Sequence, residues 1–199
     1  MKMPSLARRT IVRMTAVILC IMMMVPSFAH SEDAILTDFG VSDNGKDLLL
    51  NLRVVGAFNK QLQEAILNGI PATFSFFITL DLKRSMWPDN KVTGRTVTHT
   101  LKYHVLKNLF IVKRSWEGNK PLTTDSFEEA QQWMSEIKGF KLTSLKNLTP
   151  GKHYEIRAKA ELDKVNLPLF FNYIFFFTSL WNFETSWHSY EFIHTPSTQ

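Results

Sequence analysis

A change of hydrophobic period within residues 58–82 constrains the fold of this chain more than any other feature. The first half has the spacing of a short amphipathic helix, with Asn59 at the N-cap and Gly69 at the C′ position. Pro71 cannot continue that helix. Every second residue is then apolar, which predicts a strand with one face on a core. The residues of that face are Phe74, Phe76, Ile78, Leu80 and Leu82.

Other stretches show the same alternation and predict further antiparallel strands. The expected strands cover 34–41, 47–55, 96–105, 109–116, 154–163 and 187–194. Asn44-Gly45 predicts a hairpin turn between the first two. In the strand at 96–105, the face expected to be apolar carries Val97, His99, Leu101, Tyr103 and Val105. The alternating charges of the strand at 154–163 are interpreted as cross-strand surface pairs.

A second helix is predicted where Asp125 and Glu128 form a capping-box-like start, and it is expected to end at Gly139. The pattern as a whole predicts a mainly β protein, an antiparallel β-sandwich with an immunoglobulin-like number of strands and two or three covering helices. The alternative is an α+β fold with a single sheet and helices on one face.

The first 29 residues have the layout of a secretory signal peptide: basic residues, an apolar run at 16–25, and small residues at Ser27 and Ala29. We expect cleavage after Ala29, export to the periplasm, and a single β-rich domain at 30–199. The apolar run is about half the length of a membrane-spanning helix. The alternative is an uncleaved leader that anchors the protein in the membrane.

Removal of the leader changes the charge balance. The chain has 23 Lys and Arg against 18 Asp and Glu, and four of the basic residues but none of the acidic ones precede residue 30, which leaves 19 against 18. A clustered basic surface for nucleic acid is therefore not expected. The only cysteine, Cys20, leaves with the leader, so the mature domain has no disulfide and no thiol nucleophile.

Leu167–Trp181 is unusually apolar, because 11 of its 15 residues are Leu, Phe, Tyr, Ile or Trp. A helix of this length would be shorter than a bilayer core. We interpret the segment as a buried helix or a pair of strands. The alternative is an exposed apolar patch that contacts a membrane or a partner.

Sequence signatures of catalysis are missing. The six histidines are scattered without metal-ligand spacing, and His99 and His104 fall on opposite faces of one expected strand. No nucleophile elbow, phosphate-binding loop, dinucleotide fingerprint or calcium loop is present. The sequence therefore predicts no catalytic residues, no metal site and no cofactor, and we expect that the protein is not an enzyme.

The loop with Arg84, Trp87 and Asp89 is the best candidate for a binding surface, since a cation, an aromatic ring and a carboxylate on one turn can contact a polar partner. Trp181 and Trp187 form a second candidate. In the structural alternative, Trp87 folds back over the core and Arg84 pairs with Asp89.

Several motifs resemble an exported bacterial family called domain of unknown function 4390. They are F-N-x-x-L-x-x-A-I-x-x-G-I-P-x-T-F at Phe58–Phe74, K-R-x-x-W-x-D at Lys83–Asp89, Tyr103-His104, and L-P followed by S-x-W and S-W within Leu167–Trp187. The resemblance covers most of the mature chain. It implies a protein of the Gram-negative envelope with an accessory role in membrane signalling, and it brings no established activity, substrate or catalytic residue.

The sequence thus predicts a non-catalytic periplasmic or envelope protein that binds an envelope or membrane protein, accessory to membrane signalling. Membrane contact is expected through Leu167–Trp181 or through an uncleaved N-terminal helix. One alternative function is a carrier or sensor of an apolar small molecule or lipid. The least favoured alternative is an unrecognised hydrolase.

Overall fold

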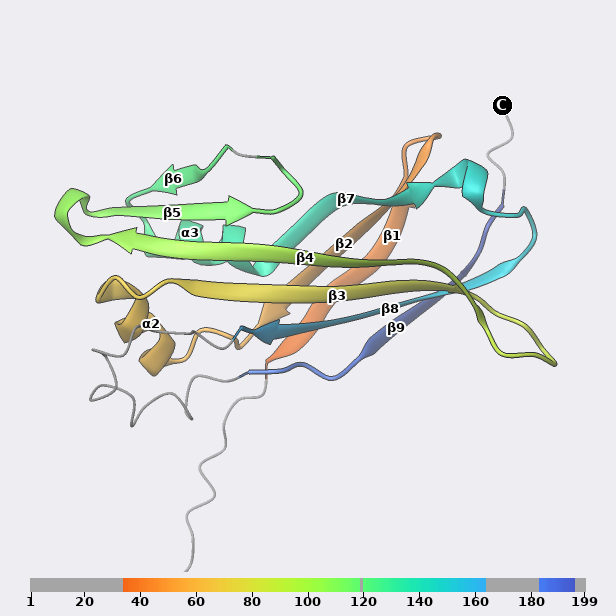
Figure 1. Cartoon of the computed structure of the whole chain (residues 1–199), viewed down its shortest axis with the longest axis horizontal. Coiled ribbons are helices and arrows are strands. Elements are labelled where there is room, and N and C mark those ends of the chain that lie inside the picture. The colour runs from red at the N-terminus through yellow and green to blue at the C-terminus, as the bar shows by residue number, and fades with distance from the viewer. Residues whose placement is uncertain (1–33, 119, 164–182, 196–199) are drawn as a thin grey trace, which may run out of the picture. The chain divides into compact units, whose positions relative to one another are not determined.

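The computed structural model describes residues 34–118, 120–163 and 183–195. The chain divides into two compact units, Met1–Glu32 and Asp33–Gln199, and the described residues all belong to the second. The predicted leader and Leu167–Trp181 both fall outside the described ranges. Within the described part of the second unit, nine strands and two α-helices form two antiparallel sheets (Figure 1).

The smaller sheet has the strand order β1-β2-β7. Its strands are β1 (Ile35–Asp43), β2 (Asp47–Val55) and β7 (Glu136–Ser144). The larger sheet has the order β6-β5-β4-β3-β8-β9. Its strands are β3 (Ala72–Leu82), β4 (Asn90–His104), β5 (Leu109–Arg114), β6 (Leu122–Thr124), β8 (His153–Leu162) and β9 (His188–Ile193). The helices are α2 (Lys60–Leu67), α3 (Phe127–Ser135) and the short 3₁₀ turns η1 (Val105–Lys107) and η2 (Leu145–Asn147).

The capping predicted for the first helix is confirmed at both ends of α2. The Asn59 side chain accepts a hydrogen bond of 2.8 Å from the Leu62 N–H. At the other end, the Ile70 N–H donates to the Ala65 carbonyl at 3.1 Å. Gly69 adopts a φ of 85°, a left-handed conformation that a side chain would strain. These bonds end the helix and direct the chain into β3.

β3 is paired along its length with β4 on one side and with β8 on the other. Four residues of its predicted apolar face, Phe74, Phe76, Ile78 and Leu80, are each at most 1% exposed, and the fifth, Leu82, is partly buried against the core. They belong to one core cluster that includes residues from both sheets, such as Leu50 of β2 and Ile137 of β7.

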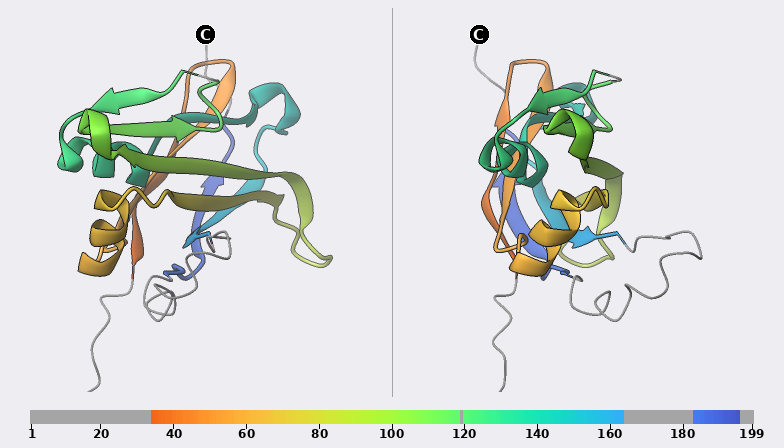
Figure 2. Two further views of the ribbon diagram at one scale, coloured as in Figure 1. Left: turned by 60° about the vertical axis from the view of Figure 1, so that its left-hand side comes forward. Right: turned by 90° about the vertical axis from the view of Figure 1, so that its left-hand side faces the viewer.

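The predicted β-sandwich is confirmed, because the two sheets enclose this core between them. Aromatic side chains link the two sheets at their margins. Phe39 of β1 meets Tyr190 of β9 edge-on, with ring centroids 6.5 Å apart, and Trp116 meets Phe140 of β7 at 5.8 Å. Figure 2 shows the smaller sheet crossing the larger one, with both helices at one end of β3 and β4.

The prediction of one helix from Asp125 to Gly139 is wrong at both ends. The N-cap is Ser126, whose hydroxyl oxygen accepts the Glu129 N–H at 3.2 Å. The helix ends at Ser135, and the residues after it form β7. Ile137 is then placed opposite Leu52 of β2, so pairing with a distant strand overrides the local helical spacing.

Gly139 marks a bulge in β7 rather than a helix end. Its φ of 65° lies in the left-handed region, and the register between β2 and β7 shifts next to it, between Leu50 and Leu52. The Gly139 N–H donates to the Asn51 side chain at 2.8 Å. Gly139, which the sequence predicts to be the end of a helix, therefore forms part of a β-bulge.

The strand predicted at 96–105 begins earlier in the structure than expected and ends one residue earlier. β4 begins at Asn90, which makes a long hairpin with β3, and its last residue is His104. Val105 belongs to η1 and is 56% exposed, so its expected place on the apolar face is wrong. Strands β6 and β7 were not predicted; the remaining predicted strands are present with ends shifted by up to two residues.

His99 occupies the apolar face of β4 and is fully buried. Its Nδ1 lies 2.9 Å from the Met134 carbonyl and therefore carries the proton, and its Nε2 accepts the Trp116 indole N–H at 3.1 Å. Burial, followed by the positive charge of Arg114, lowers the pKa of His99 to about 4, although the bond to Met134 opposes the shift. The neutral imidazole thus joins β4, α3 and the chain after β5.

Phe76 and Phe77 give a matched test of the core, because they are neighbours on opposite faces of β3. Phe76 is fully buried, whereas Phe77 lies on the outer face beside Lys159. Phe76→Ala should lower the free energy of unfolding by about 3–5 kcal/mol, and Phe77→Ala by clearly less. Urea unfolding measures both values. Equal losses would contradict the assignment of the faces.

Acid should destabilise the fold through His99. In the unfolded chain the imidazole titrates near 6.5, so between pH 6.5 and 4 the unfolded state binds a proton that the folded state does not. This contribution to stability is complete above pH 6.5 and is lost by pH 4, a change of about 3 kcal/mol. The His99→Gln variant lacks it, so the difference in unfolding free energy between unmodified chain and variant should shift by that amount. A constant difference would show that His99 is not involved.

Candidate binding surface

The outer face of the larger sheet carries a row of ion pairs along β3 and β8. Residues that face away from the core alternate with the buried ones, so Asp81 of β3 lies opposite Glu155, and Thr79 opposite Arg157. Arg157 pairs diagonally with Asp81 at 2.9 Å, and Lys83 pairs with Glu155 at 3.1 Å. The prediction of cross-strand surface pairs on β8 is therefore confirmed.

Lys159 links this row to Trp187. Its ammonium lies 5.3 Å from the centroid of the Phe77 ring and 5.7 Å from the centroid of the Trp187 ring. Glu184, at 2.6 Å, and Glu161, at 3.2 Å, hold the same nitrogen. Hydrogen bonds to Glu184 and then Glu161 raise the pKa of Lys159, which keeps the ammonium charged against both rings.

Trp187 remains 51% exposed in this arrangement. One face of its indole lies against a fixed cation, and the rest is open to solvent. The backbone before it is also fixed, because the Thr185 N–H donates to the Ala160 carbonyl at 2.9 Å and the Thr185 hydroxyl accepts the Ala160 N–H at 3.0 Å. We call Phe77, Arg157, Lys159, Glu184 and Trp187 the Trp187 face.

The other predicted site lies in the connection between β3 and β4. The Asp89 carboxylate accepts the backbone N–H of Arg84 at 3.1 Å and pairs with the Lys83 ammonium at 3.0 Å. Bonds from Lys83 and then Arg84 hold the pKa of Asp89 below its usual range, and Asp89 followed by Glu155 raises the pKa of Lys83. Asp89 thus contacts the backbone of Arg84, and its ion-pair partner is Lys83.

Trp87 does not fold back over the core, because it is 75% exposed. Next to it, Met86 is 91% exposed and was missed in the sequence analysis. The signal was present in the sequence, since two large apolar residues precede a Pro-Asp-Asn turn in an otherwise polar loop. Exposure could not be predicted without knowing that this loop is the end of a long hairpin.

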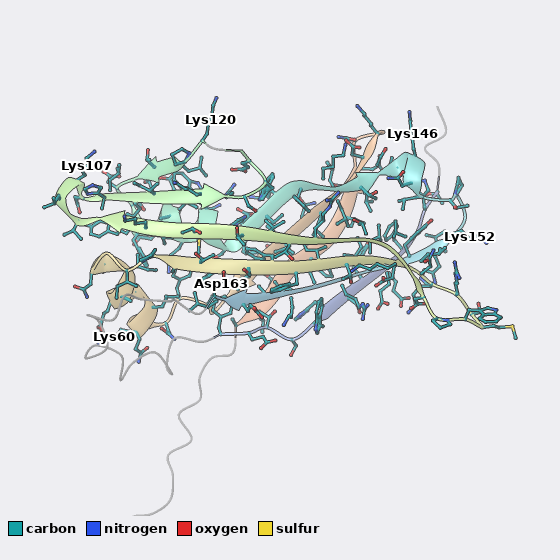
Figure 3. All side chains as sticks on the ribbon, in the orientation of Figure 1. Lys60, Lys107, Lys120, Lys146, Lys152 and Asp163 are labelled. Atoms are coloured by element: carbon teal, nitrogen blue, oxygen red, sulfur yellow. The ribbon has the colours of Figure 1, made fainter. Side chains whose placement is uncertain are left out.

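The structure therefore separates the predicted binding residues into two places. Arg84, Trp87 and Asp89 lie together at the start of β8, the end that Lys152 marks in Figure 3, whereas Trp187 lies toward the end marked by Asp163. Glu155 and Lys159, which contact the two places, are four residues apart on one strand, or about 13 Å. Trp181 lies outside the described residues.

A cleft of about 440 Å³ opens on another part of the unit, where the chain leaves β2 and passes α3. Its walls are Arg53, Val54, Val55, Gly56, Ala57, Phe58, Gln131, Gln132 and Ser135. The Arg53 guanidinium already pairs with Glu136 at 3.1 Å and with Asp38 at 3.4 Å. The cleft is the lesser candidate, because its one aromatic side chain, Phe58, packs against Phe74 and Phe127 instead of being exposed to a partner.

The described residues offer neither a metal site nor a membrane-spanning helix. Within 34–118, 120–163 and 183–195, no group of three or more His, Cys, Asp or Glu side chains is placed to hold a metal ion. Over the same ranges, the helices are too short or too polar to cross a bilayer.

Comparison with known families identifies the chain. A family profile described as "Domain of unknown function (DUF4390)" matches residues 31–191. The chain belongs to this family. The match confirms the resemblance seen in the motifs from Phe58 onward, and it covers every described strand to within two residues of the end of β9. No curated protein and no solved structure matches the DUF4390 chain.

Proposed function

We propose that the DUF4390 protein is a non-catalytic protein of the cell envelope that binds a protein partner through the Trp187 face. One observation carries the proposal: the Trp187 indole is half-exposed yet held in place by Lys159, which two carboxylates fix in turn. Ordering a flexible side chain costs binding energy, and this indole is already ordered before a partner arrives.

The composition of the face fits a protein partner. Trp and Arg are among the residues most enriched in those that dominate protein interfaces, and the face offers both Trp187 and Arg157, whose side chain is 48% exposed. The surrounding charges are paired with each other, which leaves few isolated charges to be desolvated when a partner covers them. Trp187 would be the central anchor, and Arg157 and Glu184 would lie at the rim.

The location of the protein is part of the same proposal. The basic, apolar and small residues of 1–29 support export and cleavage after Ala29, and an envelope partner follows from that location. We include an accessory role in membrane signalling in the proposal on the strength of the family resemblance. The alternative of an apolar-ligand carrier depends on Leu167–Trp181, which lies outside the described residues, and it stays a prediction.

Site-specific crosslinking tests the binding surface. A photoreactive residue at Ser189, opposite Arg157 on β9, should give one discrete adduct with an envelope protein when the full-length chain is irradiated in cells. The same residue at Lys107, at the far end of β4 and β5, should give none (Figure 3). Trp187→Ala should abolish the adduct at Ser189, whereas Leu106→Ala, which removes a still more exposed apolar side chain elsewhere, should not.

Thermal unfolding of both variants controls for stability, because neither side chain is buried and each change should cost less than about 1 kcal/mol. An adduct that persists in Trp187→Ala, or no adduct at all, would reject the Trp187 face as the binding surface.

The export prediction has its own measurement. Intact-mass analysis of the tagged chain after cell fractionation should find a soluble periplasmic species that begins at His30, since the leader carries a small residue at each of the −1 and −3 positions. A full-length species in the membrane fraction would show instead that 16–25 is an anchor.

A further inference from the structure

The tip of the β3–β4 hairpin is not part of the Trp187 face, yet it exposes two large apolar side chains. Met86 is 91% and Trp87 is 75% exposed. The hairpin leaves the sheet where β8 begins, because Leu82 is opposite Tyr154 and the Lys83 N–H donates to the His153 carbonyl at 2.9 Å. Figures 1 and 2 show the connection continuing past that end of β8.

Polar contacts close the base of the tip and tie that base to β8. At its neck, Leu82 is opposite Asn90 across the hairpin. Lys83 bridges Asp89 at 3.0 Å and Glu155 at 3.1 Å, and the Arg84 N–H bonds the other oxygen of Asp89. The loop is thus closed at its base by bonds that leave the side chains of Met86 and Trp87 outside it.

The hairpin is also more basic than the protein as a whole. Between residues 83 and 95 the charged residues are Lys83, Arg84, Asp89, Lys91 and Arg95, four cations against one anion, whereas the chain after residue 29 is nearly balanced. The single carboxylate is already bound by Lys83. Arg84 and Lys91 therefore leave a positive potential around the apolar tip, whereas Arg95 lies further along β4, opposite Ile78.

We propose that this hairpin contacts an anionic phospholipid bilayer, with Met86 and Trp87 inserted among the headgroups and with Arg84 and Lys91 against the phosphates. Tryptophan is enriched at the water–lipid interface, and basic side chains next to inserted apolar ones are attracted to anionic lipid. A protein partner fits this tip less well, since a stable protein interface buries about 800 Å² on each side and the tip presents two apolar side chains.

Membrane contact at this hairpin goes beyond the proposed function, because it uses a different surface and a different ligand. It would let the mature domain attach to a bilayer after the leader has been removed. The two proposals can fail separately, since neither Met86 nor Trp87 belongs to the Trp187 face.

A fluorescent probe on the hairpin tests the contact in the full chain. Cys20→Ser removes the only cysteine, and Ser85→Cys then supplies one thiol beside Met86 for an environment-sensitive dye. With vesicles of equal phosphatidylglycerol and phosphatidylcholine, the emission should shift to the blue and be quenched by lipids that carry a nitroxide on the headgroup. With phosphatidylcholine alone, or in about 0.5 M salt, the response should be much smaller, because salt screens the attraction.

The matched control places the dye at Leu106→Cys, a 94% exposed position in η1 at the opposite end of β4. It should report water with every vesicle, which separates hairpin contact from attachment through the leader. In the Ser85→Cys chain, Trp87→Ser should weaken the vesicle response about 10-fold or more, as expected for losing one large apolar side chain from the interface. Neutralising Arg84 and Lys91 to Gln should remove its dependence on phosphatidylglycerol.

Three outcomes would overturn the proposal. The dye at residue 85 could stay in water with anionic vesicles, or the dyes at 85 and 106 could respond alike. A response at residue 85 that requires added envelope protein and no lipid would assign the tip to a protein partner instead. Circular dichroism of each variant checks that the fold is intact, and the altered side chains at 84, 85, 87, 91 and 106 are all at the surface.

Discussion

The double pairing of β3 is the constraint on which the rest of this structure depends. With β4 on one side and β8 on the other, the strand has no free edge along its length, so its register fixes the positions of both neighbours. Its even-numbered residues line the core, and its odd-numbered residues lie on the outer face, where Asp81 pairs with Arg157 of β8. A slip of one residue would exchange the two faces and place Asp81 in the core in exchange for Leu80.

The core extends from β3 through contacts that are polar as well as apolar. His99 sits behind Phe76, with ring centroids 4.9 Å apart, and carries its two hydrogen bonds to Met134 and Trp116. A buried imidazole that lost either partner would leave a polar atom unsatisfied, so the position of α3 relative to β4 is specified by more than shape. Met134 is the next-to-last residue of α3, and β7 follows directly from it into the smaller sheet.

The parts of the fold that could be predicted are those in which the residues of one strand or helix determine its structure through local contacts. Residues 154–162 alternate strictly and 74–82 alternate except at Phe77, and Asn59 and Gly69 cap α2 through contacts within twelve residues. The break between α3 and β7 could not be predicted in this way. Ile137 continues the helical spacing of Met134, and only pairing with β2, more than eighty residues earlier, makes it part of a strand.

The candidate binding residues differ in the same way: some could be found from local sequence and others could not. The loop at 84–89 could be found from its composition, because its contacts are local. The contact of Lys159 with Trp187 could not, since it depends on the register at which the chain returns to β8 after residue 182. Met86 was overlooked for a related reason: whether a side chain in a loop is exposed is decided by how the loop is closed, which sequence spacing does not show.

Charge matching explains why aromatic and apolar side chains, rather than ions, are what the outer face of the larger sheet offers to other molecules. Along β8, the cations Arg157 and Lys159 each have a carboxylate partner within 3 Å, and Lys83 has two at 3.0 and 3.1 Å. Such exposed pairs add little to stability individually. Their effect is to leave the face nearly neutral and its side chains ordered. At one end of the row, the Lys159 ammonium lies against the Trp187 ring. At the other end, the Lys83 ammonium closes the base of the loop that carries Trp87. A lysine bound by two carboxylates therefore supports each of these exposed indoles.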